Sequence, residues 1–467
     1  MSEVLDRKAG GGSTSSGRRD EMAISGASAG QETLHRIVVV GGGAAGLELV
    51  TRLGDRLGRR GRASVTLVEC ARTHLWKPFL HAVAAGSINA GEYELNYLAQ
   101  AHWHSFQYRF GEMVGIDRVA KEVKLAAAFD EEGQQITPAR TIGYDTLVIA
   151  IGSVTNDFGT EGASEHAVPL ETPKQAKRFN RRLFNAFLRA QTQKGPVLPG
   201  QLHVAIVGAG ATGIELAAEL YNTTREMVAY GLDRIDPWRD IRVVLIEARD
   251  RVLPGLPLRI SKAARTMLNR MSIDVRTGAR VRQVTPDGLR LVDGTFIAAE
   301  LVVWAAGVKA PAVLRQLDGL ETNRINQLVV DATLQTTRDT DIFAIGDCAA
   351  CPRPGTSTTV PPRAQAAHQQ AAHLARQIER RLRGQPLQPY TYRDFGSLVS
   401  LGRWSVVGNL MGFLFSRGIF IEGLFARIMY RSLRLMHERA LSGTTRALLA
   451  LIARGLAHHV DPPVKLH

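Results

Sequence analysis

The sequence predicts an α/β protein built around two Rossmann-like dinucleotide-binding domains. The glycine motif GxGxxG occurs twice, and each copy follows a short β-branched apolar run and opens a helical pattern. Each copy is also followed by a second apolar run that ends in a glutamate. One such motif is weak evidence, whereas two copies in the same strand–helix–strand context favour two dinucleotide sites.

Length and charge set limits on the organisation. The chain has 467 residues, which at roughly 100–200 residues per domain suggests two to four domains. Its net charge of +14 indicates an anionic partner, and its three cysteines fit a reducing compartment. Residues 1–33 are polar and glycine-rich, which predicts a disordered tail and no signal peptide. No run reaches 18 apolar residues, so no transmembrane helix is expected.

The first glycine motif lies in RIVVVGGGAAGLELV (36–50). Gly41 permits the tight turn, Gly43 lets the backbone approach a pyrophosphate, and Gly46 lets helix and strand pack closely. The helix N-terminus then offers amide donors to the phosphates. Glu69 ends the next strand, where a carboxylate can accept hydrogen bonds from both ribose hydroxyls of an adenosine.

The second motif repeats this arrangement with Gly208, Gly210 and Gly213. Its strand-end carboxylate is Glu247, which follows at a longer distance because a polar insertion occupies 221–240. A carboxylate there repels a 2′-phosphate, so NADH is favoured over NADPH at this site. The alternative for either motif is a structural glycine turn that binds no ligand.

Three further apolar runs, each ending near a glycine, suggest how the domains are connected. The first two end at Gly152 and Gly307 and mark crossings between the domains. We therefore predict an FAD-binding domain in two parts, 34–155 and 309–390, with an NADH-binding domain, 156–308, inserted between them.

The third run ends in Gly346-Asp347. This fold-level pattern resembles the glutathione reductase superfamily, which implies that Asp347 contacts the FAD ribitol or pyrophosphate. The alternative is an Asp that caps the next helix. The disulfide reductases of that superfamily carry a cysteine pair soon after the first motif, and 72–88 has none, so electrons should pass to an outside acceptor. Cys348 and Cys351 form a CxxC that is more simply explained by packing than by metal binding.

A specific family resemblance follows from THLWKPFLHAVAAGSI (73–88), GAGATGIELAAEL (208–220), WAAGVKAP (304–311) and VPPRAQAAHQ (360–369). These segments resemble the bacterial type II NADH:quinone oxidoreductases, over more than nine-tenths of the chain. The resemblance implies FAD and NADH as cofactors, a membrane quinone as acceptor, and no proton pumping.

The resemblance also places the quinone beneath a helix with an AQxAxQ signature. Here the signature maps onto Ala364, Gln365, Ala367 and Gln369. The two glutamines are one helical turn apart and share a face, and each amide can donate to a quinone carbonyl. The small alanines leave room for a flat ring. Without the resemblance, a plain surface helix would be the better interpretation.

Two more site residues come from the resemblance. Glu215, early in the second motif's helix, is implied to lie near the nicotinamide–flavin contact, where it positions nicotinamide or handles protons. The alternative is a carboxylate favoured by the helix N-terminus. Lys77 is a weaker candidate beside the flavin. His74, His81 and His368 are expected to be packed or solvated histidines. We predict no metal site.

The C-terminal segment, 391–467, carries ten cations against four acids. Its stretch 424–441 has helical periodicity with one basic and one aliphatic face, and 446–459 adds a second apolar patch. A basic amphipathic helix predicts an anchor on an anionic membrane surface. A homodimer interface is the alternative, and both can hold. Nucleic acid is not expected, because the cations lie beside large aliphatics without an aromatic stacking platform.

The sequence thus predicts an FAD-dependent NADH:quinone oxidoreductase at the cytoplasmic face of the bacterial inner membrane. A soluble NADH-dependent ferredoxin or rubredoxin reductase is the alternative enzyme. An NADH-sensing membrane scaffold without turnover is the alternative from another class.

Overall fold

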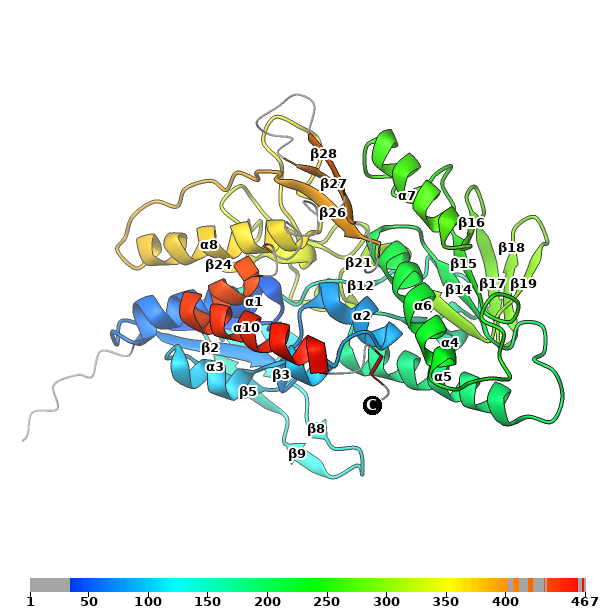
Figure 1. The fold of residues 1–467 in the computed structure, drawn as a ribbon. Coiled ribbons are helices and arrows are strands. Elements are labelled where there is room, and N and C mark those ends of the chain that lie inside the picture. The colour runs from blue at the N-terminus through cyan, green and yellow to red at the C-terminus, as the bar shows by residue number, and fades with distance from the viewer. Residues whose placement is uncertain are drawn as a thin grey trace, which may run out of the picture. The chain divides into compact units, whose positions relative to one another are not determined.

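Two mainly parallel β-sheets organise the chain, in a computed structural model that describes residues 34–401, 406–410, 419–422, 432, 435–460 and 464–465 (Figure 1). The predicted tail, 1–33, lies outside the described residues.

The first sheet has six strands, of which all but the edge strand β23 run parallel. In spatial order they are β23 (Gln335–Thr336), β24 (Asp339–Ala344), β11 (Thr146–Ile149), β1 (Arg36–Val40), β2 (Ser64–Glu69) and β5 (Gln107–Phe110). β24 comes from far along the chain and pairs with β11 in the register Leu147 to Ile342. The first sheet is therefore built from two separate segments of the chain.

The second sheet lies between those segments in the sequence. Its five strands are all parallel. They are β13 (Ala167–Pro169), β20 (Leu301–Trp304), β14 (His203–Val207), β15 (Arg242–Ile246) and β16 (Asp274–Arg276). The chain passes from the first sheet to the second through β12 (Val154–Thr155) and returns through β21 (Val308–Lys309). These two short strands pair in an antiparallel ribbon. The central strands of both sheets, such as β1, β11, β14 and β20, are almost entirely buried, as β-branched runs covered on both faces should be.

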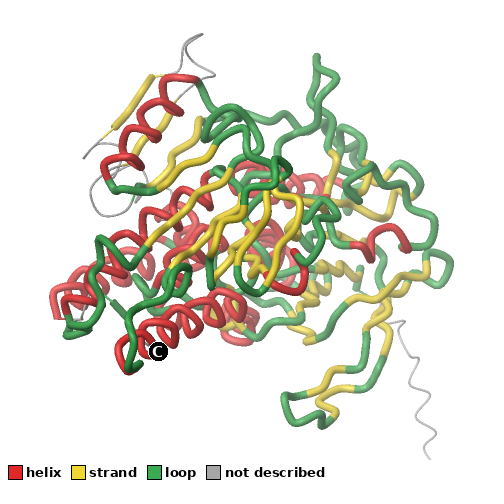
Figure 2. Tube along the Cα trace, turned by 90° about the vertical axis from the view of Figure 1, so that its right-hand side faces the viewer, coloured by secondary structure: helices red, strands yellow, loops and turns green. Residues whose placement is uncertain are grey.

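Helices flank the strands of these sheets (Figure 2). The helices of the first segment are α1 (Ala44–Leu53), its π-helical continuation (Gly54–Gly58), α2 (Leu80–Ala85) and α3 (Tyr97–Trp103). Those of the second sheet's segment are α4 (Ala163–His166), α5 (Pro173–Thr192), α6 (Ala211–Ala229) and α7 (Leu258–Arg270). α8 (Ala364–Arg381) packs on α1, and α2 packs on both α5 and α6.

Smaller strands complete the described structure. In chain order they are β3 (Thr73–His74), β4 (Leu95–Asn96), β6 (Met113–Asp117), β7 (Glu122–Leu125), β8 (Ala128–Phe129), β9 (Gln135–Thr137), β10 (Arg140–Gly143), β17 (Val281–Thr285), β18 (Gly288–Leu291), β19 (Phe296–Ala298), β22 (Leu328–Val329) and β25 (Ala349–Ala350). Short 3₁₀ turns cover Lys77–Phe79, Ala90–Glu92, Ala312–Gln316 and Gly346–Cys348.

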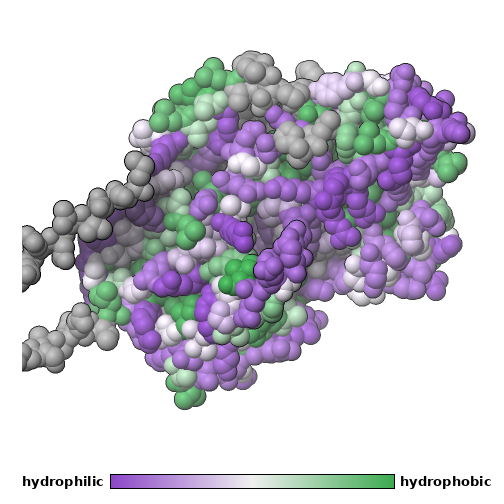
Figure 3. Space-filling model, turned by 90° about the horizontal axis from the view of Figure 1, so that it is seen from below, coloured by the Kyte–Doolittle hydropathy of each residue, from purple (hydrophilic) through white to green (hydrophobic). Residues whose placement is uncertain are grey.

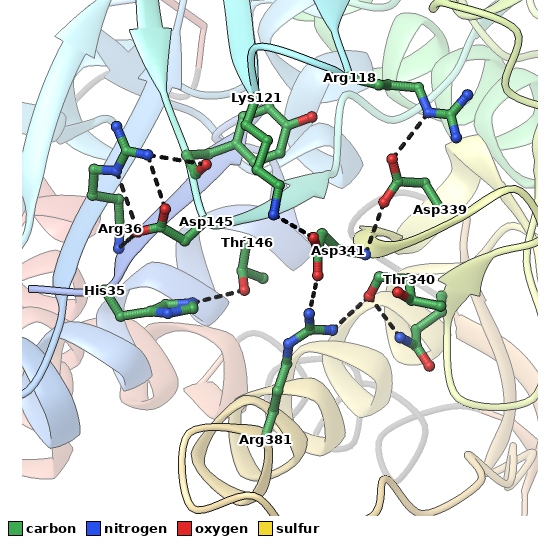
Figure 4. A network of polar contacts seen from close by, with 12 residues as sticks. His35, Arg36, Arg118, Lys121, Asp145, Thr146, Asp339, Thr340, Asp341 and Arg381 are labelled. Carbon is green, nitrogen blue, oxygen red and sulfur yellow. Dashed lines mark hydrogen bonds and ion pairs between the residues drawn. The ribbon is translucent and has the colours of Figure 1, made fainter.

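A polar network secures the returning strand β24 at the amino edge of the first sheet (Figure 4). Lys121 Nζ donates to Asp341 Oδ2 at 2.6 Å, and Arg381, at the end of α8, donates to the other oxygen of that carboxylate. Arg118 Nε donates to Asp339 Oδ2 at 3.0 Å. These charged pairs lie away from the carboxyl edge, where ligands bind in parallel sheets, so we assign them to assembly of the sheet.

The region after residue 391 differs from the sequence prediction. It begins with a three-stranded antiparallel sheet of β26 (Gly396–Ser400), β27 (Val406–Leu410) and β28 (Ile419–Glu422), which the sequence analysis did not anticipate. Most of the predicted amphipathic helix, 424–441, lies outside the described residues. Helix α10 (Thr444–Val460) contains the second predicted apolar patch, 446–459.

The surface drawn in Figure 3 is largely hydrophilic, with smaller apolar areas between the polar ones. Among the described residues, no helix combines the length and apolar character that crossing a membrane requires.

Candidate functional site: two glycine turns and the residues between them

The first glycine turn follows β1 and opens α1. Gly41 has a left-handed φ of +102°, and a Cβ there would lie 2.5 Å from the Ala150 carbonyl oxygen, so only glycine fits. A Cβ on Gly46 would lie 1.8 Å from the Gly41 carbonyl oxygen. A Cβ on Gly43 would instead meet nothing within 4 Å. The backbone at Gly43 therefore borders open space at a helix N-terminus, as a pyrophosphate site requires.

The second glycine turn repeats this geometry between β14 and α6. Gly208 has φ +106°, and a Cβ there would lie 2.8 Å from the Ala305 carbonyl oxygen. A Cβ on Gly213 would lie 2.0 Å from the Gly208 carbonyl oxygen, and one on Gly210 would meet nothing within 4 Å. In both turns no side chain caps the helix, so its first amides stay available for an anion.

The two strand-end glutamates occupy equivalent positions. Glu69 Oε2 accepts from the Gly42 amide at 2.5 Å, and Oε1 accepts from the Ala71 amide at 3.0 Å. Glu247 accepts in the same way from the amides of Ala209 and Arg249, at 2.9 and 3.0 Å. Each carboxylate is thus fixed beside its glycine turn, where the predicted adenosine ribose would lie.

The loops after β11 and β24 meet at the carboxyl edge of the first sheet. Gly152 adopts φ +71°, and the next residue, Ser153, donates from its hydroxyl to Asp347 Oδ2 at 2.8 Å. Lys77 Nζ donates to the Ser153 carbonyl at 2.7 Å. The predicted residues Lys77, Gly152 and Asp347 therefore lie together. Gly307, with φ +67°, packs against the Phe158 ring at the crossing between the sheets.

The capping alternative for Asp347 is wrong. Gly346–Cys348 is a short 3₁₀ turn followed by β25, and α8 begins only at Ala364, with Arg363 at its N-cap position. Gln370, which was not among the predicted site residues, is a buried α8 residue whose Oε1 accepts from the Gly346 amide at 2.7 Å. It is Gln370, beside the predicted Gln369, that links α8 to this turn.

Glu215 is buried on α6. Its Oε1 accepts from the Ser400 amide at 3.0 Å, and its Oε2 lies 3.5 Å from His81 Nδ1. Burial raises the pKa of Glu215 to about 8, despite the Ser400 hydrogen bond, and burial lowers the pKa of His81 to about 4. At neutral pH both groups are therefore mainly uncharged, and Glu215 holds a proton that it can give up.

Gln365 and Gln369 share one face of α8, as predicted, and that face binds the segment before β26. Gln365 Nε2 donates to the Gly396 carbonyl at 3.0 Å, and its Oε1 accepts from the Phe395 amide at 3.0 Å. Gln369 exchanges two hydrogen bonds with the backbone of Arg393, at 2.8 and 3.0 Å. Both amide groups are thus engaged by protein backbone. Ala367 is buried, and Ala364 is partly exposed at the helix start.

Comparison with known proteins shows the broad class of enzyme to which the chain belongs. Residues 35–371 match the family model described as pyridine nucleotide-disulphide oxidoreductase. A solved structure of NDH2 from Plasmodium falciparum in complex with NADH superposes with a TM-score of 0.76 at 17% identity, over 92% of this chain and 100% of that one, which supports the fold.

Relatives in sequence narrow the class. The type II NADH:quinone oxidoreductase of Haemophilus influenzae is 42% identical over 446 residues, 93% of this chain and 100% of the relative. That of Staphylococcus aureus strain NCTC 8325 is 28% identical over 81% of this chain and 90% of the relative. The chain belongs to the type II NADH:quinone oxidoreductase family, which confirms the resemblance found in the sequence.

Proposed function

We propose that this chain oxidises NADH and reduces a quinone, with FAD as the bound cofactor. The observation that carries the proposal is the repeated glycine turn, each copy with its own fixed glutamate, in a chain of which 93% aligns with a type II NADH:quinone oxidoreductase. The ferredoxin or rubredoxin alternative has no comparable support. The direct test is NADH oxidation coupled to quinone reduction without oxygen.

The two turns divide the cofactors between them. In the first, the amides near Gly43 would hold the FAD pyrophosphate and Glu69 the adenosine ribose. Lys77, Gly152 and Asp347 would lie along the rest of the cofactor. In the second, the amides near Gly210 would hold the NADH pyrophosphate, Glu247 its ribose, and Gly307 would pass beside it. We propose that residues 34–155 and 309–390 form the FAD-binding domain and that residues 156–308 form the NADH-binding domain.

When bound, FAD supplies the two-electron chemistry, accepting a hydride from NADH and passing the electron pair to the quinone. The protein supplies alignment and protons. Glu215 is our candidate for a proton donor, because it is protonated at neutral pH and lies on the helix that follows the NADH turn. Its neutrality also removes a charge that would otherwise be costly to bury.

The quinone site is proposed to lie at the α8 face of Gln365 and Gln369, with Ala364 and Ala367 leaving room for the ring. Because both amides bind the segment 393–396, we assign them a shaping role: they hold that segment as one wall of the site. Direct donation to a quinone would require one of these hydrogen bonds to exchange.

Gln365→Ala should therefore weaken quinone use and spare NADH use. The variant loses the hydrogen bonds to Phe395 and Gly396, and we expect the KM for a water-soluble quinone to rise about tenfold. The rate of flavin reduction by NADH, measured by stopped flow, should not change. Gln385→Ala, at an exposed position beyond α8, is the matched control. An unchanged quinone KM in Gln365→Ala would remove this face from the quinone site.

Membrane association is proposed through the C-terminal segment. Along α10, five large aliphatic side chains are exposed: Leu448, Leu449, Leu451, Ile452 and Leu456. Arg446 stacks over the Trp103 ring at 4.2 Å, and Arg454 pairs with Glu438, so the helix is held while its apolar side stays open. Such a surface fits the interface of an anionic membrane, at the cytoplasmic face of the inner membrane. A homodimer is the other arrangement that would cover it.

The double variant Leu449→Ser/Leu456→Ser should bind anionic vesicles at least about tenfold more weakly, because two leucines no longer leave water. Flotation with phosphatidylglycerol vesicles measures this. Leu198→Ser, at a 62% exposed position outside α10, should bind normally. If the double variant floats as well as the wild type but sediments as a smaller species, α10 is a dimer surface.

A further inference from the structure

Three histidines form a continuous chain of hydrogen bonds beside the first glycine turn. His74 and His437 are buried, and His368 is partly exposed. His74 Nδ1 lies 3.0 Å from the Gly42 carbonyl oxygen, and its Nε2 lies 3.3 Å from His437 Nε2. His437 Nδ1 lies 3.3 Å from His368 Nε2. The chain ends on Glu48 of α1, which His368 Nδ1 contacts and which Arg52 also binds. His74 and His368 were expected to be ordinary packed or solvated residues, and His437 was not among the predicted site residues.

The hydrogen-bonding capacity of each atom fixes the proton positions. A carbonyl oxygen only accepts, so His74 must donate from Nδ1, and its Nε2, in the neutral ring, accepts from His437. His437 therefore carries its proton on Nε2 and accepts at Nδ1 from His368. Burial lowers the pKa of His74 to about 4 and that of His437 well below its usual value, so both rings are neutral at pH 7.

Every donor in this chain thus points from Glu48 toward Gly42. At the Glu48 end, one carboxylate oxygen accepts from Arg52 and the other contacts His368 Nδ1. Because the other end is a peptide carbonyl, which does not take up a proton, the chain cannot deliver protons to a cofactor. Its effect is to orient the Gly42 carbonyl.

That orientation matters for the turn. Tyr97 OH also donates to the Gly42 carbonyl, at 2.8 Å, so the oxygen is drawn into the protein by two donors. In a trans peptide the amide of the next residue points the opposite way. Holding the Gly42 carbonyl inward therefore turns the Gly43 N–H outward, toward the open space where the FAD pyrophosphate is assigned.

His437 comes from a part of the chain remote from this turn. It lies in the helical segment 435–442, just before α10, and is 4% exposed. Its ring stacks on Trp76, with ring centroids 5.0 Å apart. Buried Gln100 adds a second link, donating to the Leu441 carbonyl at 2.5 Å. The C-terminal segment is thus docked against the residues that support the glycine turn.

We propose that His437 is a positioning residue for FAD, which couples docking of the C-terminal segment to retention of the cofactor through His74 and Gly42. The inference rests on the assignment of the first turn to FAD and is independent of which quinone is used. By thermodynamic linkage the coupling is reciprocal: a docked segment favours bound FAD, and bound FAD favours a docked segment.

His437→Phe tests the first direction. Phenylalanine keeps a ring over Trp76 but has no donor for His74. We expect FAD to leave the holoenzyme about fivefold faster, as followed by flavin fluorescence after dilution, with the KM for NADH unchanged. Met436→Ala, at a 65% exposed neighbouring position, should release FAD at the wild-type rate. Tyr97→Phe, which removes the second donor to Gly42, should also accelerate release.

Hydrogen exchange of the wild-type protein tests the reverse direction and needs no variant. With FAD removed, amides of 435–460 should exchange faster, whereas those of α7 should exchange as before. Equal FAD release from His437→Phe and Met436→Ala would overturn the proposal. The proposal would also be overturned if hydrogen exchange of residues 435–460 did not respond to FAD. The three histidines would then serve only in packing. Failure of NADH oxidation would instead count against the proposed function, which these two readouts do not use.

Discussion

Gly210→Ala is expected to raise the KM for NADH at least about tenfold while leaving the melting temperature unchanged. A Cβ at this position would enter open space, and its backbone is extended with φ −75°, so the fold itself does not resist alanine. The added methyl would occupy the volume through which the NADH pyrophosphate approaches the helix amides. Steady-state kinetics and thermal unfolding of the same preparation measure the two effects.

The first turn provides the counterpart. Gly43→Ala places a methyl in the equivalent open space, with φ −67°, and should lower FAD content without lowering secondary structure. Gly195→Ala, in a loop where a Cβ also meets nothing within 4 Å, is the neutral control for both. If Gly210→Ala lost FAD, or Gly43→Ala weakened only NADH, the assignment of the two turns would be reversed.

Glu215→Gln is expected to reduce quinone turnover about 100-fold and to remove a limb from the pH profile. In the wild type, a donor with a pKa of about 8 should make kcat fall tenfold per pH unit above that value. Glutamine cannot release a proton, so the residual activity of the variant should not depend on pH there. Flavin reduction by NADH should be unaffected. If the variant instead raised the KM for NADH, Glu215 would position nicotinamide.

The same substitution should change stability with a defined sign. Burial raises the pKa of Glu215 above its ordinary value of 4.5, so between pH 4.5 and about 8 the folded protein binds a proton that the unfolded chain releases. The free energy of unfolding therefore falls as pH rises through that window, by up to about 5 kcal/mol. Relative to wild type, Glu215→Gln should gain stability at pH 9, whereas Glu165→Gln, at an exposed carboxylate, should not.

Local patterns made the dinucleotide turns predictable. Gly41, Gly46, Gly208 and Gly213 are glycines because a Cβ would collide with backbone a few residues or one strand away. Glu69 and Glu247 stand at strand ends, so their register with the turns follows from the parallel pairing of neighbouring strands. The polar insertion at 221–240 was also placed correctly, as the end of α6 and the loop that follows.

The hydrogen-bond partners of Gln365 and Gln369 could not be predicted from local sequence patterns. Gln365 and Gln369 share a face because helical spacing dictates it, but their partners lie 24 to 31 residues away in an irregular segment without periodicity. His437 meets His74 across 363 residues. The antiparallel sheet of β26, β27 and β28 was missed because the sequence analysis assigned secondary structure after residue 391 only to the helical pattern 424–441 and the apolar patch 446–459, and the sheet precedes both. Long-range packing, not local propensity, decides these contacts.

The central claim is that electrons pass from NADH through FAD to a quinone, and an anaerobic titration of the holoenzyme tests it most directly. One equivalent of NADH should bleach the flavin absorbance, and a water-soluble quinone added afterwards should restore it at the rate of steady-state turnover. Flavin absorbance that does not respond to NADH would contradict the account. So would flavin that stays bleached with quinone but is reoxidised by an oxidised ferredoxin.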